Sequence, residues 1–169
     1  MKRITVTTLS IVLLAASLSA KGPTLRILIR DTALGAVTDI RDRSVLDQFN
    51  VWAGRGTFSG APGHEVEASQ GFIIDWPAGV ADSRPGQLRR YEVRFFVSHR
   101  SSSAEELAYV VFYENDPSTG KGYVYLPGRS DEHFRLNVQS VHRGNGLEGH
   151  WFHANGAWQA VVGGLRAVR

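Results

Sequence analysis

The sequence predicts an α+β fold built on a mainly antiparallel sheet of five to seven strands. Three runs rich in Val, Tyr and Phe follow one another, over Arg90–Arg100, Leu107–Glu114 and Gly122–Gly128, and turn residues separate them. Such runs are typical of consecutive antiparallel strands. Two helices complete the prediction: a short helix after the first strands, and a C-terminal helix that packs on the sheet.

Each of the three central runs has its own pattern. Apolar residues alternate with mostly polar ones from Tyr91 to Val97, which predicts a strand with one buried face. The second run is apolar throughout, as in a strand covered on both faces. Pro117 and Gly120 predict a hairpin turn before the third run. Ser102 and Glu105 have the spacing of a capping box and predict one helical turn between the first two runs.

The elements before these runs are shorter. Strands are predicted over Thr24–Arg30 and Leu34–Ile40 from their apolar patterns. Asp42 is a suitable N-cap for a short helix over Arg43–Phe49. A further strand is predicted over Gly71–Trp76, and a loop rich in Pro and Gly leads from there into the central runs.

The C-terminal part is predicted as a strand followed by a helix. Phe134–Val138 alternates apolar and polar residues, which indicates a strand. A glycine-rich turn at residues 144–146 follows. Asn155 can then cap a helix whose apolar side runs from Trp158 to Leu165 with helical spacing.

The chain begins with a segment typical of a secretory signal peptide. A basic start, Met1-Lys2-Arg3, precedes a mostly apolar run over Ile4–Leu18, and small residues follow up to Ala20. We therefore predict a cleaved signal over residues 1–20 and one globular domain over residues 21–169. The alternative is an uncleaved anchor, but its apolar run is short of the roughly 20 residues needed to span a bilayer.

Composition and charge narrow the class of protein. The 169 residues include 19 Lys and Arg against 16 Asp and Glu. Because Lys2 and Arg3 leave with the signal, the mature domain is nearly neutral, which argues against nucleic acid as a partner. The lack of cysteine excludes disulfides, thiolate metal sites and a cysteine nucleophile. The predicted location is secreted or periplasmic, with no membrane insertion after signal cleavage.

The tyrosines are the first candidate for a binding site. All five lie inside the three central runs, at odd-numbered positions. If Tyr113 pairs with Tyr123, then Tyr109, Tyr113, Tyr123 and Tyr125 share one face of the sheet, whereas a slip of one residue separates them. Tyrosines on a sheet face can stack on a flat ligand or a sugar. The alternative interpretation is that these rings are scaffold, covered by the C-terminal helix.

Histidines are the second candidate. His142 and His150 flank the turn at residues 144–146, and His133 precedes them, so these three rings are the candidate ligands of a metal. The alternative is that they are scattered surface histidines, because no metalloenzyme spacing is present. The loop Ala53–Gln70 contains two close glycines but lacks the third glycine of a dinucleotide-binding loop. No nucleophile elbow occurs in the chain.

Several short sequence segments together resemble those of a group of uncharacterised small bacterial proteins. They are Phe72–Trp76, Arg90–Val93, Gly122–Gly128, Phe134–Val138 and the late tryptophans Trp151 and Trp158. The resemblance covers most of the mature chain and implies an intact stand-alone domain, without any assigned activity or functional residue. It also implies an Ile-Thr-Asp-Pro opening to the first helix, and the chain departs from it with Ile40-Arg41-Asp42-Arg43.

These observations support a functional hypothesis and two alternatives. The first is an exported, non-catalytic binding or interaction module whose partner is an envelope protein or a small ligand, with no cofactor. The second is a small secreted hydrolase or metal-dependent enzyme that uses the C-terminal histidines. The third is a structural component of a larger envelope assembly, which an exposed apolar patch would favour.

Overall fold

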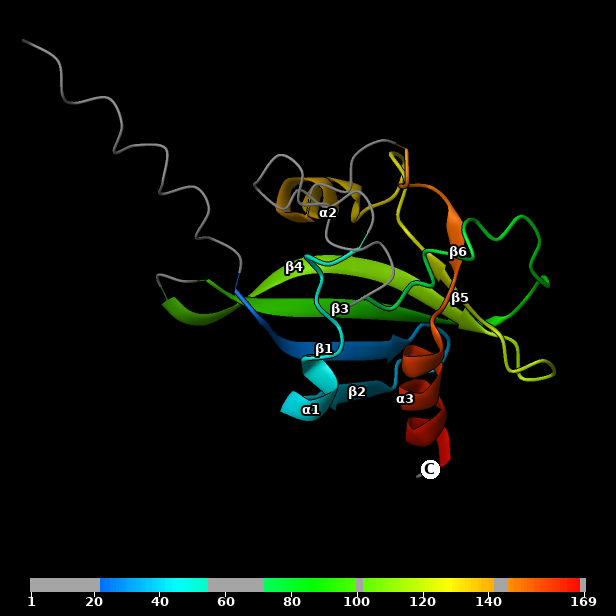
Figure 1. Ribbon diagram of the computed structural model, residues 1–169, viewed down its shortest axis with the longest axis horizontal. Helices are drawn as coiled ribbons and strands as arrows, with labels where there is room; N and C mark the ends of the chain where they lie inside the picture. The colour runs from blue at the N-terminus through cyan, green and yellow to red at the C-terminus, as the bar shows by residue number, and fades with distance from the viewer. Residues whose placement is uncertain (1–21, 55–71, 100–101, 142–145, 168–169) are drawn as a thin grey trace, which may run out of the picture.

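The computed structural model describes residues 22–54, 72–99, 102–141 and 146–167 (Figure 1). The predicted signal peptide and most of the predicted loop Ala53–Gln70 therefore lie outside the described residues. None of the described helices is long and apolar enough to cross a membrane.

A six-stranded antiparallel sheet forms the centre of the fold, with the strand order β2-β1-β3-β4-β5-β6. The strands are β1 (Thr24–Asp31), β2 (Val37–Ile40), β3 (Arg89–His99), β4 (Ser102–Asn115), β5 (Gly122–Tyr125) and β6 (Trp151–His153). The strands β3 and β4 pair along almost their whole length. The predicted α+β class and antiparallel sheet are therefore confirmed.

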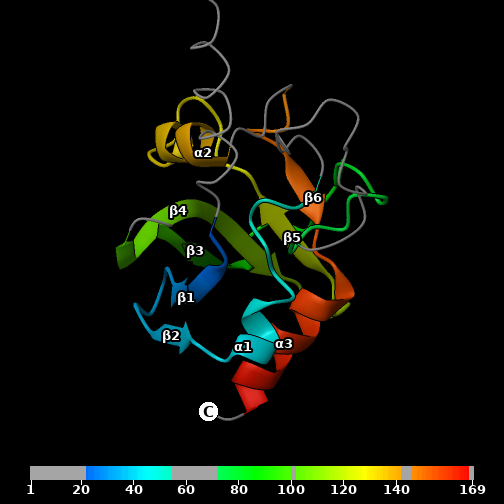
Figure 2. The same cartoon turned by 60° about the vertical axis from the view of Figure 1, so that its left-hand side comes forward.

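One face of the sheet carries the hydrophobic core under α1 (Arg43–Leu46) and α3 (Gly156–Ala167) (Figures 1 and 2). Trp158 of α3 is fully buried, and its ring meets Phe49 and Tyr113 edge-on, at centroid distances of 5.2 and 6.0 Å. The C-terminal helix thus packs on the sheet as predicted. The helix predicted over Arg43–Phe49 is a single turn, in which Asp42 accepts a hydrogen bond from the Ser44 N–H.

The helix α2 (Phe134–Val141) lies against the free edge of β4, so the prediction of a strand over Phe134–Val138 is wrong. The reason lies in the unequal lengths of β4 and β5, because β5 pairs with β4 only from Phe112 to Asn115. The rest of the β4 edge needs another partner for its backbone groups. Asn137 of α2 supplies it at Val110: the Val110 N–H donates to Oδ1 at 2.9 Å, and Nδ2 donates to the Val110 carbonyl at 2.6 Å.

Two other local predictions differ from the structure. Ser102 and Glu105 belong to β4 instead of a helical turn, because β3 and β4 continue to pair as far as His99 and Ser102. The segment Phe72–Trp76 forms only one bridge, between Ile74 and Ala154. This segment and the loop after it cover the outer edge of β6, where the Ala81 N–H donates to the Trp151 carbonyl at 2.8 Å. The covered edge protects β6 from pairing with another chain.

Candidate functional site

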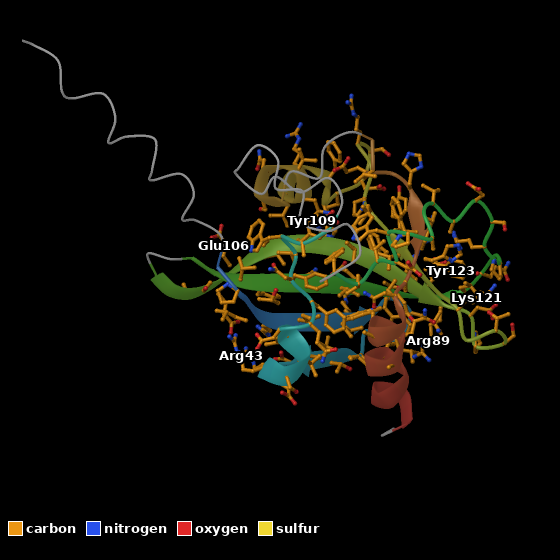
Figure 3. All side chains as sticks on the ribbon, in the orientation of Figure 1. Arg43, Arg89, Glu106, Tyr109, Lys121 and Tyr123 are labelled. Carbon is orange, nitrogen blue, oxygen red and sulfur yellow. The ribbon has the colours of Figure 1, made fainter. Side chains whose placement is uncertain are left out.

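The register between β4 and β5 separates the four candidate tyrosines. Tyr113 pairs with Val124 rather than with Tyr123, which is the one-residue slip that separates the tyrosines, so the four do not share one face. Tyr109 and Tyr113 lie in the core and are 1% and 0% exposed. Tyr123 and Tyr125 face the other side of the sheet, where Figure 3 shows Tyr123 close to Lys121 and away from Tyr109. Only Tyr123 and Tyr125 can therefore take part in a surface site.

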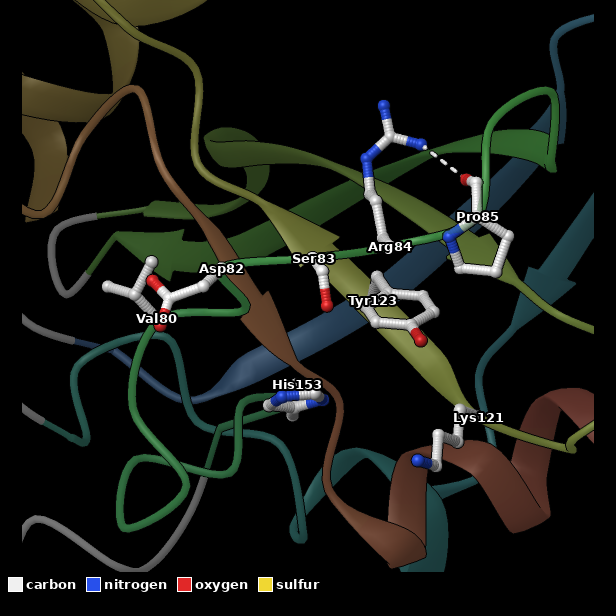
Figure 4. A pocket seen from close by; sticks show the side chains of 8 residues that line it. All are labelled: Val80, Asp82, Ser83, Arg84, Pro85, Lys121, Tyr123 and His153. Atoms are coloured by element: carbon white, nitrogen blue, oxygen red, sulfur yellow. Dashed lines mark hydrogen bonds between the residues drawn. The ribbon is translucent and has the colours of Figure 1, made fainter.

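A pocket of about 530 Å³ opens beside Tyr123 at the β5–β6 end of the sheet (Figure 4). The loop before β3 supplies Val80, Asp82, Ser83, Arg84 and Pro85, and the strands and their turn supply Lys121, Tyr123 and His153. A volume of this size is typical of a site for a small molecule. We therefore treat this pocket as the candidate functional site.

The floor of the pocket is a pair of rings fixed by strand pairing. Tyr123 lies directly opposite His153 in the β5–β6 ladder, and the ring centroids are 5.6 Å apart. The neighbouring pair, Tyr125 and Trp151, stacks at 5.0 Å. Tyr123 lines the pocket and is only 4% exposed, so little of its ring surface is open to a ligand.

The wall formed by loop 80–85 is held to the sheet by Arg84, which shares the Glu114 carboxylate with Arg90 of β3. Glu114 is 2% exposed and accepts from Arg84 at 2.5 Å and from Arg90 at 2.9 Å. Both guanidinium groups also lie over the Trp151 ring, at 4.1 and 5.7 Å from its centroid. Charge-assisted hydrogen bonds and cation–π contacts together fix this wall before any ligand arrives.

The hairpin turn between β4 and β5 positions Lys121. The Asp116 carboxylate accepts hydrogen bonds from the Ser118 N–H at 2.9 Å, the Ser118 hydroxyl at 2.6 Å and the Thr119 hydroxyl at 2.8 Å. The Asp116 N–H donates to the Lys121 carbonyl at 2.8 Å and closes the turn. The hydrogen bonds from the Ser118 and Thr119 side chains, followed by that from the Ser118 backbone, lower the pKa of Asp116.

The lowered pKa of Asp116 predicts an acid-sensitive turn. Because its pKa is lower in the folded chain than the unfolded value of about 3.9, Asp116 contributes stability above that value. This contribution is lost as the pH falls through the folded pKa. We expect the free energy of unfolding to fall less between pH 6 and pH 3 in Asp116→Asn than in the wild type, as measured by urea denaturation. Equal losses in the two proteins would contradict this account.

Five polar side chains around the pocket are available to a ligand. They are Asp82, Ser83, Lys121, Tyr123 and His153, and none of these side chains forms a hydrogen bond or an ion pair with another described residue. By contrast, the Tyr125 hydroxyl outside the pocket donates to Asp131 at 2.9 Å. Burial, and secondly this hydrogen bond, raise the pKa of Tyr125. The pocket thus concentrates polar groups that have not been used by the fold.

The candidate metal ligands have separate surroundings. The His133 ring lies 6.3 Å from the Phe112 ring, and its Nε2 is 3.6 Å from the Glu92 carboxylate. His150 is exposed, and His142 lies outside the described residues. Within the described ranges, no group of three or more His, Asp or Glu side chains could hold a metal ion. A site that includes His142 stays a prediction.

Sequence reasoning missed most of the pocket. The Pro- and Gly-rich segment before β3 is typical of a connecting loop, and it contains Asp82, Ser83 and Arg84. His153 gains its place only from the β5–β6 register, which no local pattern specifies. Comparison with known proteins yields no match to any family model, curated protein or solved structure. The site is therefore interpreted from its geometry alone.

Proposed function

We propose that the protein is an exported, non-catalytic binding module that holds a small polar ligand in the pocket beside Tyr123 and His153. The observation that carries this proposal is the set of five polar side chains, unpaired among the described residues, around the paired rings of Tyr123 and His153. Unpaired polar groups gathered in a preformed pocket are the usual means by which a protein orients a ligand. Export is supported by the signal sequence predicted at the N-terminus.

The arrangement favours binding over covalent catalysis. Ser83 and His153 have the residue types of a nucleophile and its base, but the two side chains make no hydrogen bond with each other. Activation of a serine requires that contact and a third group to orient the base. The hydrolase or metal-dependent alternative also depends on His133 and His150, which do not line the pocket.

Native mass spectrometry of the mature protein, purified from its own exported fraction, tests the proposal. We expect a non-covalent adduct of small mass on the wild type. Tyr123→Phe removes only the pocket hydroxyl and should weaken binding by about three- to tenfold, since one neutral hydrogen bond contributes about 0.5–1.5 kcal/mol. Tyr125→Phe removes the neighbouring hydroxyl outside the pocket and should retain the adduct.

Two results would reject a ligand at this pocket. One is that the wild type shows only the mass of the protein, without an adduct, under conditions that preserve weak complexes. The other is an adduct that Tyr125→Phe weakens as much as Tyr123→Phe does, because the ligand would then lie away from the pocket. In either case an envelope protein becomes the partner to seek.

A further inference from the structure

The pocket contains one uncommitted negative charge and one uncommitted positive charge. Arg84 also lines it, but its guanidinium is bound to Glu114 and stacked on Trp151. Figure 4 shows this group pointing away from Tyr123. The remaining ionic groups are Asp82 and Lys121, and neither forms an ion pair with a described residue.

These two charges lie at opposite ends of the pocket. In Figure 4 Asp82 lies at one side and Lys121 at the other, with Ser83, Tyr123 and His153 between them. No ion pair joins the two side chains and both residues are exposed, so each charge is available to a ligand. The uncharged hydroxyls between them can donate to a carboxylate or a carbonyl oxygen, and they can accept from an amide N–H.

A ligand with a single charge suits this arrangement poorly. An anion would be attracted to Lys121 and repelled by Asp82, and a cation would meet the reverse. A neutral sugar would make no ionic contact with either charge. It would also find little ring surface to stack on, because Tyr123 is 4% exposed. A molecule with an ammonium at one end and a carboxylate at the other satisfies both ends together.

We infer that the pocket binds a zwitterion of the amino-acid or short-peptide class. The ligand's ammonium group lies toward Asp82 and its carboxylate toward Lys121. Ser83, Tyr123 and His153 hydrogen-bond the polar atoms between the two ends. The inference rests on the proposed function and specifies the chemistry of the ligand at the same site. The pocket volume of about 530 Å³ accommodates a free amino acid or a peptide of two to three residues.

The test uses the mature protein and two sets of probes, the twenty common amino acids and a pool of dipeptides, screened by saturation-transfer NMR. We expect at least one probe to bind, and the two sets distinguish a free amino acid from a peptide as the preferred form. The best probe is then N-acetylated or C-amidated, so that one charge at a time is removed. Each modification should weaken binding to the wild type by tenfold or more.

Matched substitutions locate each end of the ligand. In Asp82→Asn, acetylation of the probe should cost little further affinity, while amidation should still cost tenfold. In Lys121→Met the pattern should be reversed. Glu132→Gln changes an exposed carboxylate outside the pocket lining and should leave both effects as in the wild type.

Lys121 also offers a direct signal, because it is the single lysine among the described residues. Dimethylation of lysines with ¹³C keeps the charge, and Lys21→Arg removes the other lysine of the predicted mature chain. The Lys121 methyl resonance should shift with the unmodified probe and not with the amidated one. The inference of a zwitterionic ligand would be contradicted if no probe bound. It would also be contradicted if Asp82→Asn, Lys121→Met and Glu132→Gln all lowered the affinity for the probe equally. The proposed function would survive that result if native mass spectrometry still found a different adduct that Tyr123→Phe weakens.

Discussion

Trp158→Ala is expected to lower the free energy of unfolding by about 3–5 kcal/mol, because it deletes the largest fully buried side chain of the core. The indole contacts Phe49 from the loop after α1, Phe95 from β3 and Tyr113 from β4. These rings come from distant parts of the chain and cannot all close on the space that the indole leaves. The loss therefore includes a cavity term as well as the lost transfer free energy.

Urea denaturation of the mature protein measures this loss, and two variants serve as controls. Trp158→Phe should cost less than alanine, because it keeps a ring and removes an indole N–H that has no hydrogen-bond partner among the described residues. Trp52→Ala removes a half-buried tryptophan at the edge of the core and should cost less than Trp158→Ala. If Trp158→Ala cost no more than Trp52→Ala, the packing of α3 on the sheet would be wrong.

The core of the fold was predictable because its signals are local. The alternation from Tyr91 to Val97 appears in β3 as a buried face, and the apolar run of β4 is buried on both faces, as at Val110 and Val111. The apolar spacing that begins at Trp158 appears as the buried side of α3. Each pattern repeats over two or more turns or pleats, so tertiary packing reinforces the local preference.

The site was less predictable because it depends on register. The same tyrosines face the core or the pocket according to a shift of one residue between β4 and β5. The turn from Asp116 to Lys121 sets that register through hydrogen bonds that its Gly and Pro content does not specify. The pocket wall also depends on Glu114, which binds Arg84 and Arg90. In the sequence Glu114 is a single acidic residue at the end of an apolar run, and nothing around it predicts this role.

The segment Phe134–Val138 shows why an alternating pattern can mislead. Its apolar residues Phe134, Leu136 and Val138 are only half-buried, and the polar residue between them, Asn137, is 1% exposed. A strand would place Asn137 on the face opposite to the apolar residues. As a helix, the segment instead directs the Asn137 amide at the unpaired edge of β4, where it occupies the place of a neighbouring strand.

Asn137→Ala is therefore expected to cost about 2–4 kcal/mol, because it leaves two buried backbone groups of Val110 without a partner. Hydrogen exchange of the Val110 amide gives a local readout, since its protection should fall more than that of Val111, next along β4. Asn137→Asp keeps an acceptor for the Val110 N–H but sets a carboxylate against the Val110 carbonyl, so it should also lower the free energy of unfolding.

The control is Gln139→Ala on the exposed side of α2, which should change the free energy of unfolding by less than about 0.5 kcal/mol. If Asn137→Ala behaved like Gln139→Ala, α2 would be held by its apolar contacts alone, and the edge of β4 would need another partner.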